Sequence, residues 1–440
     1  MASRKVKRFE KIGHTHYLRV PIVWTVATIV IIAGLTLALW SAERGRATHL
    51  QVKNPGELGA MVPSIVGLTQ SSLERGNSVQ LLENGDGFFP LLLRDIAAAR
   101  ESIHIESYIW WKGAICDQVA KALADKARQG VEVRLLVDAS GGHKMDDNLR
   151  DMMLAAGCQV RPFHPIRFSN LGRLNNRDHR KEAIIDGRIG YIGGYGFAKE
   201  WTGNGQDKEH WRDTGVRVEG PIVNRLQSAF TENWVEETGE IPAGLKYFPP
   251  PAAAAGPTAA HLAYTSPTGS VSSVQVLYYL AIVSAKKSII IQNPYMLPDD
   301  DALAALAAAV KRGVDVRVMV PATSSTDSPI VQHASHHQFG ALMKAGVKIW
   351  EFQRTLLHQK IIVVDGVWSC VGSTNFDDRS FQLNDEISMG ILDPQIAAQL
   401  TAAFEADKKF AVERHLDEWE KRPLWHKAMD GLAYLGSSQL

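Results

Sequence analysis

The sequence predicts an α/β protein made of two copies of one structural unit, preceded by an apolar segment near the N-terminus. Three observations lead to this prediction. Short apolar runs typical of strands alternate with segments whose apolar residues recur at helical spacing. Five of these segments recur in the same order in the second half of the chain. One long stretch without charges precedes both halves.

The repeat is clearest in five pairs of segments. In the first half the order is ARESIHIESYIW, ARQGVEVRLLVD, AAGCQVRPF, HRKEAIID and RDTGVRVEGP. In the second half it is AKKSIIIQNPYML, VKRGVDVRVMVP, KAGVKIWEF, HQKIIVVD and NDEISMGILDP. Because chance seldom gives five matches in one order with similar spacing, the sequence predicts a duplication.

The repeat also sets the expected domain boundaries. We expect a first domain over residues 75–240 and a second over residues 266–440, joined by a Pro/Ala-rich linker over 241–265. Residues 41–74 would connect the first domain to the apolar segment. Because strands alternate with helices, we expect an α/β sheet with parallel strands. Two such units would lie side by side about a pseudo-two-fold axis.

Residues 21–40 form the apolar stretch, PIVWTVATIVIIAGLTLALW, which contains no charge. As a helix it would be about 30 Å long, which matches the hydrocarbon core of a bilayer. More basic residues precede it, within the segment 1–20, than follow it at a comparable distance. This bias predicts a cytoplasmic N-terminus and a single-pass anchor. A cleaved signal peptide is the alternative, but the stretch is long for one and the following LWSAERG has no good cleavage site.

The composition argues against some classes of protein. The chain has 440 residues, with 48 Lys and Arg against 47 Asp and Glu. Such a balance is not typical of proteins that coat nucleic acid, so no nucleic-acid partner is expected. The three cysteines lie far apart without a CxxC pair, which indicates neither a disulfide framework nor a zinc site.

A His-x-Lys pair followed four residues later by Asp-Gly occurs once in each half. The pairs are His179 with Lys181 and His358 with Lys360. In a strand, residues two apart point the same way, so each pair presents an imidazole and an ammonium group on one face. Brought together by the pseudo-two-fold axis, the two pairs would surround one small anion such as a phosphate.

These side chains can transfer a phosphoryl group. One imidazole can attack phosphorus and form a phosphohistidine while the other protonates the leaving oxygen, and the roles are exchanged in a second step. The lysines supply the positive charge, so neither a metal nor a cofactor is expected. Asp186 and Asp365 belong to the repeated motif and are kept as catalytic candidates, although an Asp-Gly pair is also a strong hairpin-turn signal.

Further polar residues follow each motif. After the second come Ser373 and Asn375, which are small and suited to hold phosphoryl oxygens. Glu386 lies one strand further on, and Asp213 occupies the equivalent place in the first half. A carboxylate there can accept a hydrogen bond from the far nitrogen of a catalytic imidazole and fix its tautomer. Each acid taken alone would serve equally well as a surface salt-bridge partner.

The paired motifs resemble the phospholipase D superfamily, whose signature is His-x-Lys-x4-Asp in two copies. The resemblance covers nearly everything from about residue 75 onward. The phrases WRDTGVRVEGP, NPYMLP and DEWEKRPLWHKAMDGLAYL resemble bacterial cardiolipin synthases and related phosphatidyltransferases. The resemblance implies two duplicated phospholipase D-like α/β sandwich domains. It also implies that His179 is the nucleophile and His358 the general acid, and that the phosphoryl group is bound by Lys181, Lys360 and Asn375.

The sequence departs from the family pattern at one place. Where the family usually has Asn in a Gly-Gly-x-Asn stretch, this chain reads Gly193-Gly194-Tyr195-Gly196, and Gly196 stands where Asn375 stands in the other half. One phosphate-holding amide is therefore missing. We expect backbone N–H groups around Gly194 and Gly196 to bind the substrate instead, since glycine lets a backbone approach a ligand closely.

Two other clusters have alternative interpretations. His333, His336 and His337 have helical spacings that would suit a metal, but no Asp, Glu or Cys completes the set, so an exposed or packing role is favoured. The segment 161–181 mixes Arg with Phe just before the first motif. It would suit either a mouth for anionic headgroups or an ordinary basic loop.

The leading hypothesis is a membrane-anchored phosphatidyltransferase that moves a phosphatidyl group through a phosphohistidine to a glycerol-type alcohol such as phosphatidylglycerol. By the resemblance, its partners are membrane phospholipids and the bilayer, and it resides in a bacterial inner membrane with the catalytic domain on the extracytoplasmic side. The first alternative is hydrolysis of phospholipids to phosphatidic acid by the same site. A nuclease or other phosphodiesterase of the superfamily is a further alternative, and a non-catalytic binding module is favoured only by Gly196.

Overall fold

A computed structural model of the chain describes residues 16–42, 49–165, 175–250, 254–267 and 271–437. The chain divides into two units, residues 1–48 and 49–440, and each is described by itself. The first unit contains helix α1 (His16–Ala42). Within the described residues, no helix is both long enough and apolar enough to cross a membrane. The anchor expected over residues 21–40 stays a prediction.

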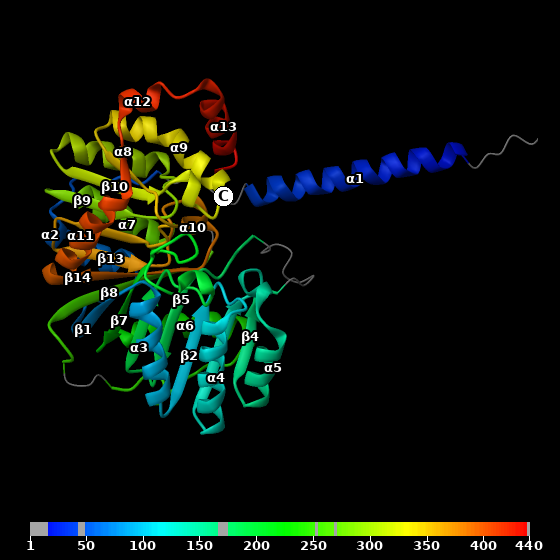
Figure 1. Cartoon of the computed structure of the whole chain (residues 1–440), viewed down its shortest axis with the longest axis vertical. Coiled ribbons are helices and arrows are strands. Elements are labelled where there is room, and N and C mark those ends of the chain that lie inside the picture. Colours follow the sequence, from blue (N-terminus) through cyan, green and yellow to red (C-terminus); the bar gives the residue numbers. More distant parts are fainter. Residues whose placement is uncertain (1–15, 43–48, 166–174, 251–253, 268–270, 438–440) are drawn as a thin grey trace, which may run out of the picture. The chain divides into compact units, whose positions relative to one another are not determined.

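The second unit is built around one sheet, which has fifteen strands in the described part of the chain (Figure 1). The strands of the first half are β1 (Glu74–Glu83), β2 (Ser102–Ser107), β3 (Glu132–Asp138), β4 (Gln159–Phe163), β5 (Lys181–Ile185), β6 (Ile189–Gly193) and β7 (Thr214–Glu219). Those of the second half are β8 (Thr258–Thr265), β9 (Ser288–Gln292), β10 (Asp315–Pro321), β11 (Lys348–Phe352), β12 (Ile361–Val364), β13 (Trp368–Gly372), β14 (Glu386–Leu392) and β15 (Ala411–Arg414).

The two halves of the sheet have the same strand order when they are read outward from its centre. The first half runs β1-β7-β6-β5-β2-β3-β4, and the second runs β8-β14-β13-β12-β9-β10-β11 with β15 added at the edge. β1 and β8 pair antiparallel at the centre. The two strands that follow the His-x-Lys pairs, β5 and β12, therefore occupy equivalent places.

The prediction of parallel strands is only partly right. β2, β3 and β4 run parallel, and so do β9, β10 and β11. The strands nearer the centre are antiparallel, because β5 with β6 and β12 with β13 form hairpins closed by the Asp-Gly turns. At these turns φ is positive at Asp186 and Gly187, and again at Asp365 and Gly366. This is the backbone conformation that tight hairpin turns require.

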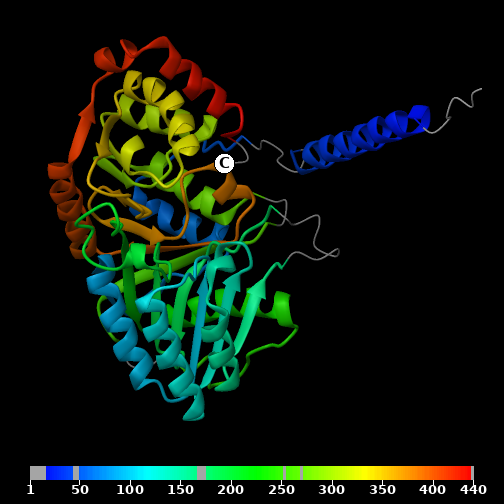
Figure 2. The ribbon, with the colours of Figure 1, turned by 45° about the vertical axis from the view of Figure 1, so that its right-hand side comes forward.

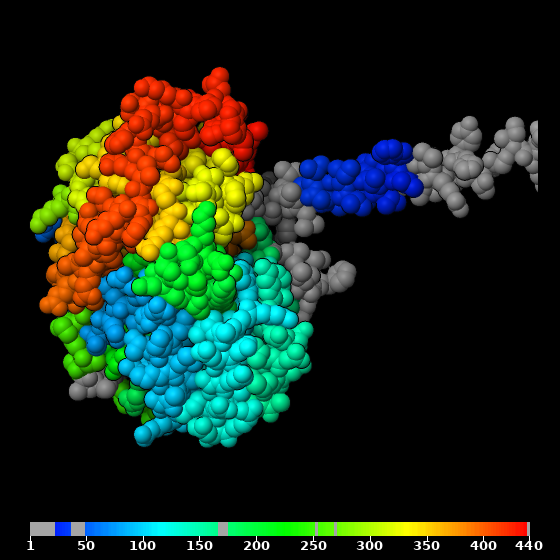
Figure 3. All heavy atoms as spheres, viewed as in Figure 1, coloured from blue at the N-terminus to red at the C-terminus, as the bar shows by residue number. Residues whose placement is uncertain are grey.

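Helices cover both faces of the sheet (Figures 1 and 2). In the described part of the second unit they are α2 (Leu58–Leu68), α3 (Asn84–Ala98), α4 (Ala114–Arg128), α5 (Asp147–Ala155), α6 (Val223–Thr238), α7 (Ser273–Ser284), α8 (Asp300–Lys311), α9 (Pro329–Lys344), α10 (Asp378–Gln382), α11 (Pro394–Asp407), α12 (Leu416–Glu420) and α13 (Leu424–Tyr434). α3, α4 and α5 share a core with one face of the first half, and α7, α8 and α9 share one with the second half. α6 and α11 belong to a third core. The last two helices, α12 and α13, lie against α9 at the surface. In Figure 3 the last two helices are red and α9 is yellow.

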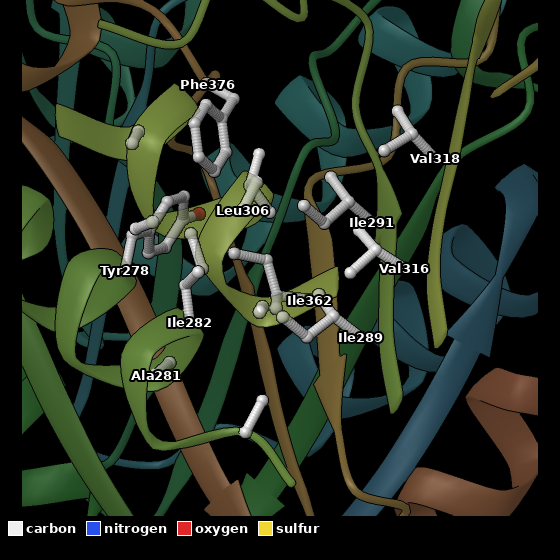
Figure 4. Packing of buried hydrophobic residues seen from close by; sticks show 14 of the residues in the cluster. Tyr278, Ala281, Ile282, Ile289, Ile291, Leu306, Val316, Val318, Ile362 and Phe376 are labelled. Carbon is white, nitrogen blue, oxygen red and sulfur yellow. The ribbon is translucent and has the colours of Figure 1, made fainter. Parts of the chain in front are cut away.

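Alternate residues of the strands enter different cores, as the pleat of a strand requires. On β5, Ala183 and Ile185 pack with α3 and α4, whereas Ile184 between them packs with α6. In the second half, Ile289 and Ile291 of β9 lie beside side chains of α7 and α8 (Figure 4). Full burial of one such side chain contributes about 1.5–3 kcal/mol.

The third core joins the two halves. It takes buried side chains from strands of both halves, such as Ile192 of β6 and Val371 of β13, together with those of α6 and α11. β6 also lies directly against β13. Residues 49–440 consequently form one compact unit. The domain boundaries at 75–240 and 266–440 remain predictions, and the shared core brings the starts of β5 and β12 to a common junction.

Candidate active site

Each His-x-Lys pair lies where the chain enters a strand beside the other half. The backbone N–H of His179 donates to the carbonyl of Asp385 at 2.9 Å, and that of His358 donates to the carbonyl of Arg212 at 2.7 Å. Asp385 and Arg212 directly precede the two acids that the repeat singled out. These bonds fix each histidine against the segment that carries the acid of the opposite half.

Each imidazole is hydrogen-bonded to the carboxylate of the other half. His179 Nδ1 lies 2.9 Å from Glu386 Oε1, and His358 Nδ1 lies 2.8 Å from Asp213 Oδ2. Both histidines are less than a tenth exposed and both acids are fully buried. Because a carboxylate accepts the hydrogen bond, Nδ1 carries the proton and Nε2 keeps its lone pair. The sequence suggested these acids as imidazole partners but left the pairing open.

The two lysines turn their ammonium groups back toward the histidines. Lys181 Nζ donates to the carbonyl of His179 at 2.7 Å, and Lys360 Nζ donates to that of His358 at 2.6 Å. Lys360 Nζ also lies 2.9 Å from Nε2 of His358. Burial lowers the pKa of Lys181 to about 8 and that of Lys360 to about 7. The charge of Lys181 lowers the pKa of Lys360 further while Asp213 opposes it, so both pairs act within one electrostatic site.

Both imidazoles are neutral in the unliganded protein. Burial, followed by the charges of Lys181 and Lys360, holds the pKa of His179 well below its usual value. Burial and then Lys360 lower the pKa of His358 to about 4, against the opposing effect of Asp213. Because the charge of Lys360 lowers the pKa of His179, the two motifs lie close to each other. A neutral imidazole whose Nε2 carries a lone pair is the form that can act as a nucleophile.

The two acids differ in charge state although they hold equivalent places. Burial raises the pKa of Glu386 to about 7, and Lys181 only partly offsets this. Burial also acts to raise the pKa of Asp213, but His358 and Lys360 lower it below its usual value. The His358 side of the site therefore carries the more firmly ionised carboxylate.

Ser373 and Asn375 follow β13 at the same junction. The Ser373 hydroxyl donates to Oε2 of Glu386, the acid that holds His179. Asn375 is 7% exposed, and its Oδ1 has no hydrogen-bond partner among the described residues. A buried amide oxygen without a partner carries a free-energy cost, and a hydroxyl of a bound ligand can remove it, whereas phosphoryl oxygens need the Nδ2–H donors of the same amide.

Asp186 and Asp365 do not join this site, which corrects their candidacy as catalytic groups. They lie at the far ends of β5 and β12 from the histidines. Asp186 accepts backbone N–H groups of residues 100–102, and Asp365 accepts those of residues 286–288. Their role is to fasten each hairpin turn to the start of the neighbouring strand.

At both glycines of the first half, protein atoms occupy the space that a side chain would need, and the expected binding of a substrate by their backbone N–H groups stays a prediction. A Cβ built on Gly194 would stand 2.5 Å from a carboxylate oxygen of Asp213, and one on Gly196 would stand 3.0 Å from the ring of Trp201. Protein atoms thus fill the space beside both glycines. Sequence reasoning missed Trp201, and the only signal for it was the absence of a side chain at position 196.

The histidine cluster on α9 is completed by acids that are distant in the sequence, so the expectation that none would complete it is wrong. His333 Nδ1 lies 2.8 Å from Asp430 Oδ1, and His336 Nε2 lies 2.6 Å from Glu351 Oε1. Ligating atoms of His333, His336 and Asp430 lie within 4.8 Å of one another. An arginine also binds each carboxylate and neutralises it, which favours the packing interpretation. Of the basic segment 161–181, residues 166–174 lie outside the described part of the chain.

Comparison with known sequences identifies relatives of this arrangement. The family model described as cardiolipin synthase, PLD-like domain, matches residues 92–234 and 279–408, so one His-x-Lys pair falls in each match. A cardiolipin synthase 1 of Staphylococcus epidermidis is 36% identical, over 82% of this chain and 74% of its own length. A cardiolipin synthase of Geobacillus kaustophilus is 34% identical, over 84% of this chain and 74% of its own length.

A solved structure shares the fold. The crystal structure of a phosphatidylserine synthase from Haemophilus influenzae Rd KW20 aligns with a TM-score of 0.64, over 85% of this chain and 98% of that chain, at 13% identity. At this identity the likeness concerns the fold. The family match covers more than half of the chain and both motifs. The chain therefore belongs to the phospholipase D superfamily, in the family of cardiolipin synthases with PLD-like domains, and is an enzyme of that superfamily.

Proposed function

We propose that the protein is a phosphatidyltransferase of the cardiolipin synthase type, which moves a phosphatidyl group to a glycerol-type alcohol such as phosphatidylglycerol. The observation that carries the proposal is the pair of neutral imidazoles, each bound to a buried acid of the other half, with a buried lysine beside each histidine. The names of the relatives, cardiolipin synthases, supply the substrate class. We further infer that the two halves are duplicated phospholipase D-like units that share this one site.

In the first step Nε2 of His179 attacks the phosphorus of the donor phospholipid. A P–N bond forms, the P–O bond to the leaving glycerol breaks, and His358 gives a proton to the leaving oxygen. The bound phosphodiester brings a negative charge to the site, which raises the pKa of His358 from its low value in the empty enzyme and lets it hold that proton. The assignment of nucleophile and acid follows the family resemblance.

In the second step the roles are reversed. His358, now neutral, takes the proton of the acceptor hydroxyl, whose oxygen attacks phosphorus as the P–N bond to His179 breaks. The product is a new phosphodiester and the enzyme returns to its initial state. Glu386 and Asp213 keep the Nδ1–H tautomers throughout, and so present Nε2 of each imidazole to the phosphorus or to the oxygen.

The positive charges stabilise the phosphoryl oxygens. Lys181 and Lys360 are buried, so their charges act in a medium that screens them weakly, and no solvent has to reorganise as negative charge develops on the phosphoryl group. Asn375 adds an amide at the edge of the site, where the other half has Gly196. The phosphoryl group is thus bound by one amide, two lysines and two imidazoles.

The proposal is tested with the full-length protein in mixed micelles of detergent and phosphatidylglycerol. Mass spectrometry of the lipid products should show cardiolipin, with glycerol released in equal amount. Phosphatidic acid as the main product would mean hydrolysis, and an absence of lipid products together with cleavage of a nucleic acid would mean a nuclease. The matched controls are His179→Asn and His358→Asn, which should yield no product while melting at nearly the same temperature as the parent.

We also propose that residues 21–40 anchor the protein once in a bacterial inner membrane, with the catalytic unit on the extracytoplasmic side. The support is the uncharged stretch and the surplus of basic residues before it. A reporter enzyme that is active only outside the cytoplasm, fused after residue 440, should be active. Activity of a reporter that works only in the cytoplasm would contradict this orientation.

A further inference from the structure

The two half-sites differ at the residues that face their acids. In the second half, Ser373 follows β13 and its hydroxyl donates to Oε2 of Glu386. The first half has Gly194 at the equivalent position. A Cβ there would stand within 2.6 Å of both carboxylate oxygens of Asp213, so a serine cannot take this place. Asp213 therefore lacks the hydroxyl donor that its counterpart has.

A tryptophan supplies the missing donor. Nε1 of Trp201 donates to Oδ2 of Asp213 at 2.9 Å, the same oxygen that accepts Nδ1–H of His358 at 2.8 Å. Trp201 comes from a short 3-10 turn, Lys199–Trp201, and is fully buried. An indole N–H and an imidazole N–H thus meet on one carboxylate oxygen, and the position of the acid determines the position of the histidine.

The same ring fills the place of the missing amide. A Cβ on Gly196 would lie 3.0 Å from Cζ3 and 3.1 Å from Cη2 of Trp201. The ring also stands edge-on to His358, with centroids 5.2 Å apart and planes at 88°. Trp211 packs against both rings, 4.4 Å from that of Trp201 and 5.4 Å from that of His358. Two indoles therefore contact His358, and one of them, that of Trp201, takes the space where the repeat would place an asparagine.

We propose that Trp201 is a positioning residue that holds Asp213 and the imidazole of His358 for proton transfer. Its ring also takes the space that an amide would fill in the first half-site, so that Asn375 is the one amide that binds the phosphoryl group. This inference rests on the proposed phosphatidyl transfer. In a symmetric site the first half would have a serine and an asparagine here. Trp201 stands in place of both, with one N–H donor and no amide.

Burial alone would also explain a tryptophan at this position, since Trp201 belongs to the core formed with α3 and α4. Trp110 offers the matched control. It is also fully buried in that core, and its Nε1 has no hydrogen-bond partner among the described residues. Both residues can be changed to Phe with the same loss of atoms, but only the change at Trp201 removes a bond to the acid of His358.

The experiment compares Trp201→Phe with Trp110→Phe in the full chain. Trp201→Phe should lower kcat by about 10- to 100-fold with little change in KM, because the interaction is with the catalytic group and not with the substrate. Asp213 should also be protonated more readily without the indole donor, so the acid limb of the pH–rate profile should move to higher pH. Trp110→Phe should keep the kcat and the pH profile of the parent. A Trp201→Phe variant that melts lower but keeps both would overturn the proposal.

A rebuilt site tests the second part of the proposal. Gly196→Asn alone should lose activity because the amide meets the ring of Trp201. Trp201→Ala should also lose activity, and the double variant Gly196→Asn with Trp201→Ala should recover part of it. A double variant less active than Trp201→Ala would contradict the shared space.

A readout independent of turnover separates this proposal from the proposed function. In protein labelled with 15N-histidine, the Nδ1 and Nε2 signals of His358 should titrate at a different pH in Trp201→Phe than in the parent. Unchanged signals would refute the positioning role even if the parent makes cardiolipin. If the titration of His358 differs between Trp201→Phe and the parent but the parent makes no lipid product, the positioning role stands and only the proposed phosphatidyl transfer is rejected.

Discussion

Nδ1 of His179 lies 2.9 Å from Oε1 of Glu386, although the two residues are 207 positions apart and come from different halves of the sheet. The equivalent bond joins His358 to Asp213. A half separated from its partner would hold a histidine without its acid and an acid without its histidine. The crossed bonds therefore make the site a property of the assembled pair of halves.

The first prediction concerns these acids. Glu386→Gln should lower kcat by about 10²- to 10⁴-fold, because an amide can present its N–H to Nδ1 and stabilise the wrong tautomer of His179. Asp213→Asn should act in the same way on His358. Steady-state kinetics of lipid transfer would measure both. Glu413→Gln, at an exposed acid on β15, is the control and should keep the parent rate. Full activity of Glu386→Gln would remove tautomer control from the mechanism.

The second prediction separates the histidines. His358→Ala keeps the nucleophile, so with a phosphodiester that has a good leaving group it should form a phosphohistidine on His179 and then stall, because no base activates the acceptor. His179→Ala should form no covalent species with any substrate. Rapid quench into base, which preserves phosphohistidine, followed by mass spectrometry of the peptides would show the label. Label on residue 358 in the His179→Ala variant would reverse the assignment of roles.

The third prediction concerns pH. Lys360 has a pKa lowered to about 7 and Lys181 one lowered to about 8, so both lose their charge as the pH rises from 6 to 9. Glu386, with a pKa raised to about 7, becomes negative over the same range. All three changes weaken the binding of an anion, so the affinity for sulfate should fall by about tenfold or more between pH 6 and 9.

Sulfate is the suitable probe because its charge stays constant over this range, and calorimetry can measure its binding to the full chain. Lys360→Met should bind sulfate more weakly and with a flatter pH dependence. An affinity that is constant or rises with pH would mean that neither lysine titrates in this window.

The sequence predicted the site more completely than it predicted the sheet. Two His-x-Lys pairs at equivalent places of a repeat required a common site, and the residue types of Glu386 and Asp213 identified them as imidazole partners. Their crossed pairing could not be inferred, because it depends on how the halves pack. The alternation of strands and helices predicts only the parallel strands, and the antiparallel hairpins of the same sheet follow from the Asp-Gly turns. Trp201 could not be identified from the sequence, because its distance from Asp213 follows from the tertiary structure and the glycine at position 196 does not say which side chain takes the space.

The last prediction tests the corrected role of the motif aspartates. The carboxylate of Asp365 accepts the backbone N–H groups of residues 286–288 at 2.7–3.1 Å, and its own φ is 55°. Asp365→Ala removes the acceptor of these donors and puts alanine in a left-handed conformation, which together should cost about 1–3 kcal/mol of folding free energy.

Chemical denaturation would measure that cost, and the folded fraction of Asp365→Ala should keep a kcat within a few-fold of the parent, because the carboxylate lies at the far end of β12 from His358. Asp365→Asn is the matched variant. It keeps one acceptor oxygen and tolerates positive φ, so it should lose less stability than the alanine variant. Asp186→Ala should behave like Asp365→Ala, since its carboxylate makes the equivalent bonds. A loss of several orders of magnitude in kcat with an unchanged free energy of unfolding would return these aspartates to the catalytic group.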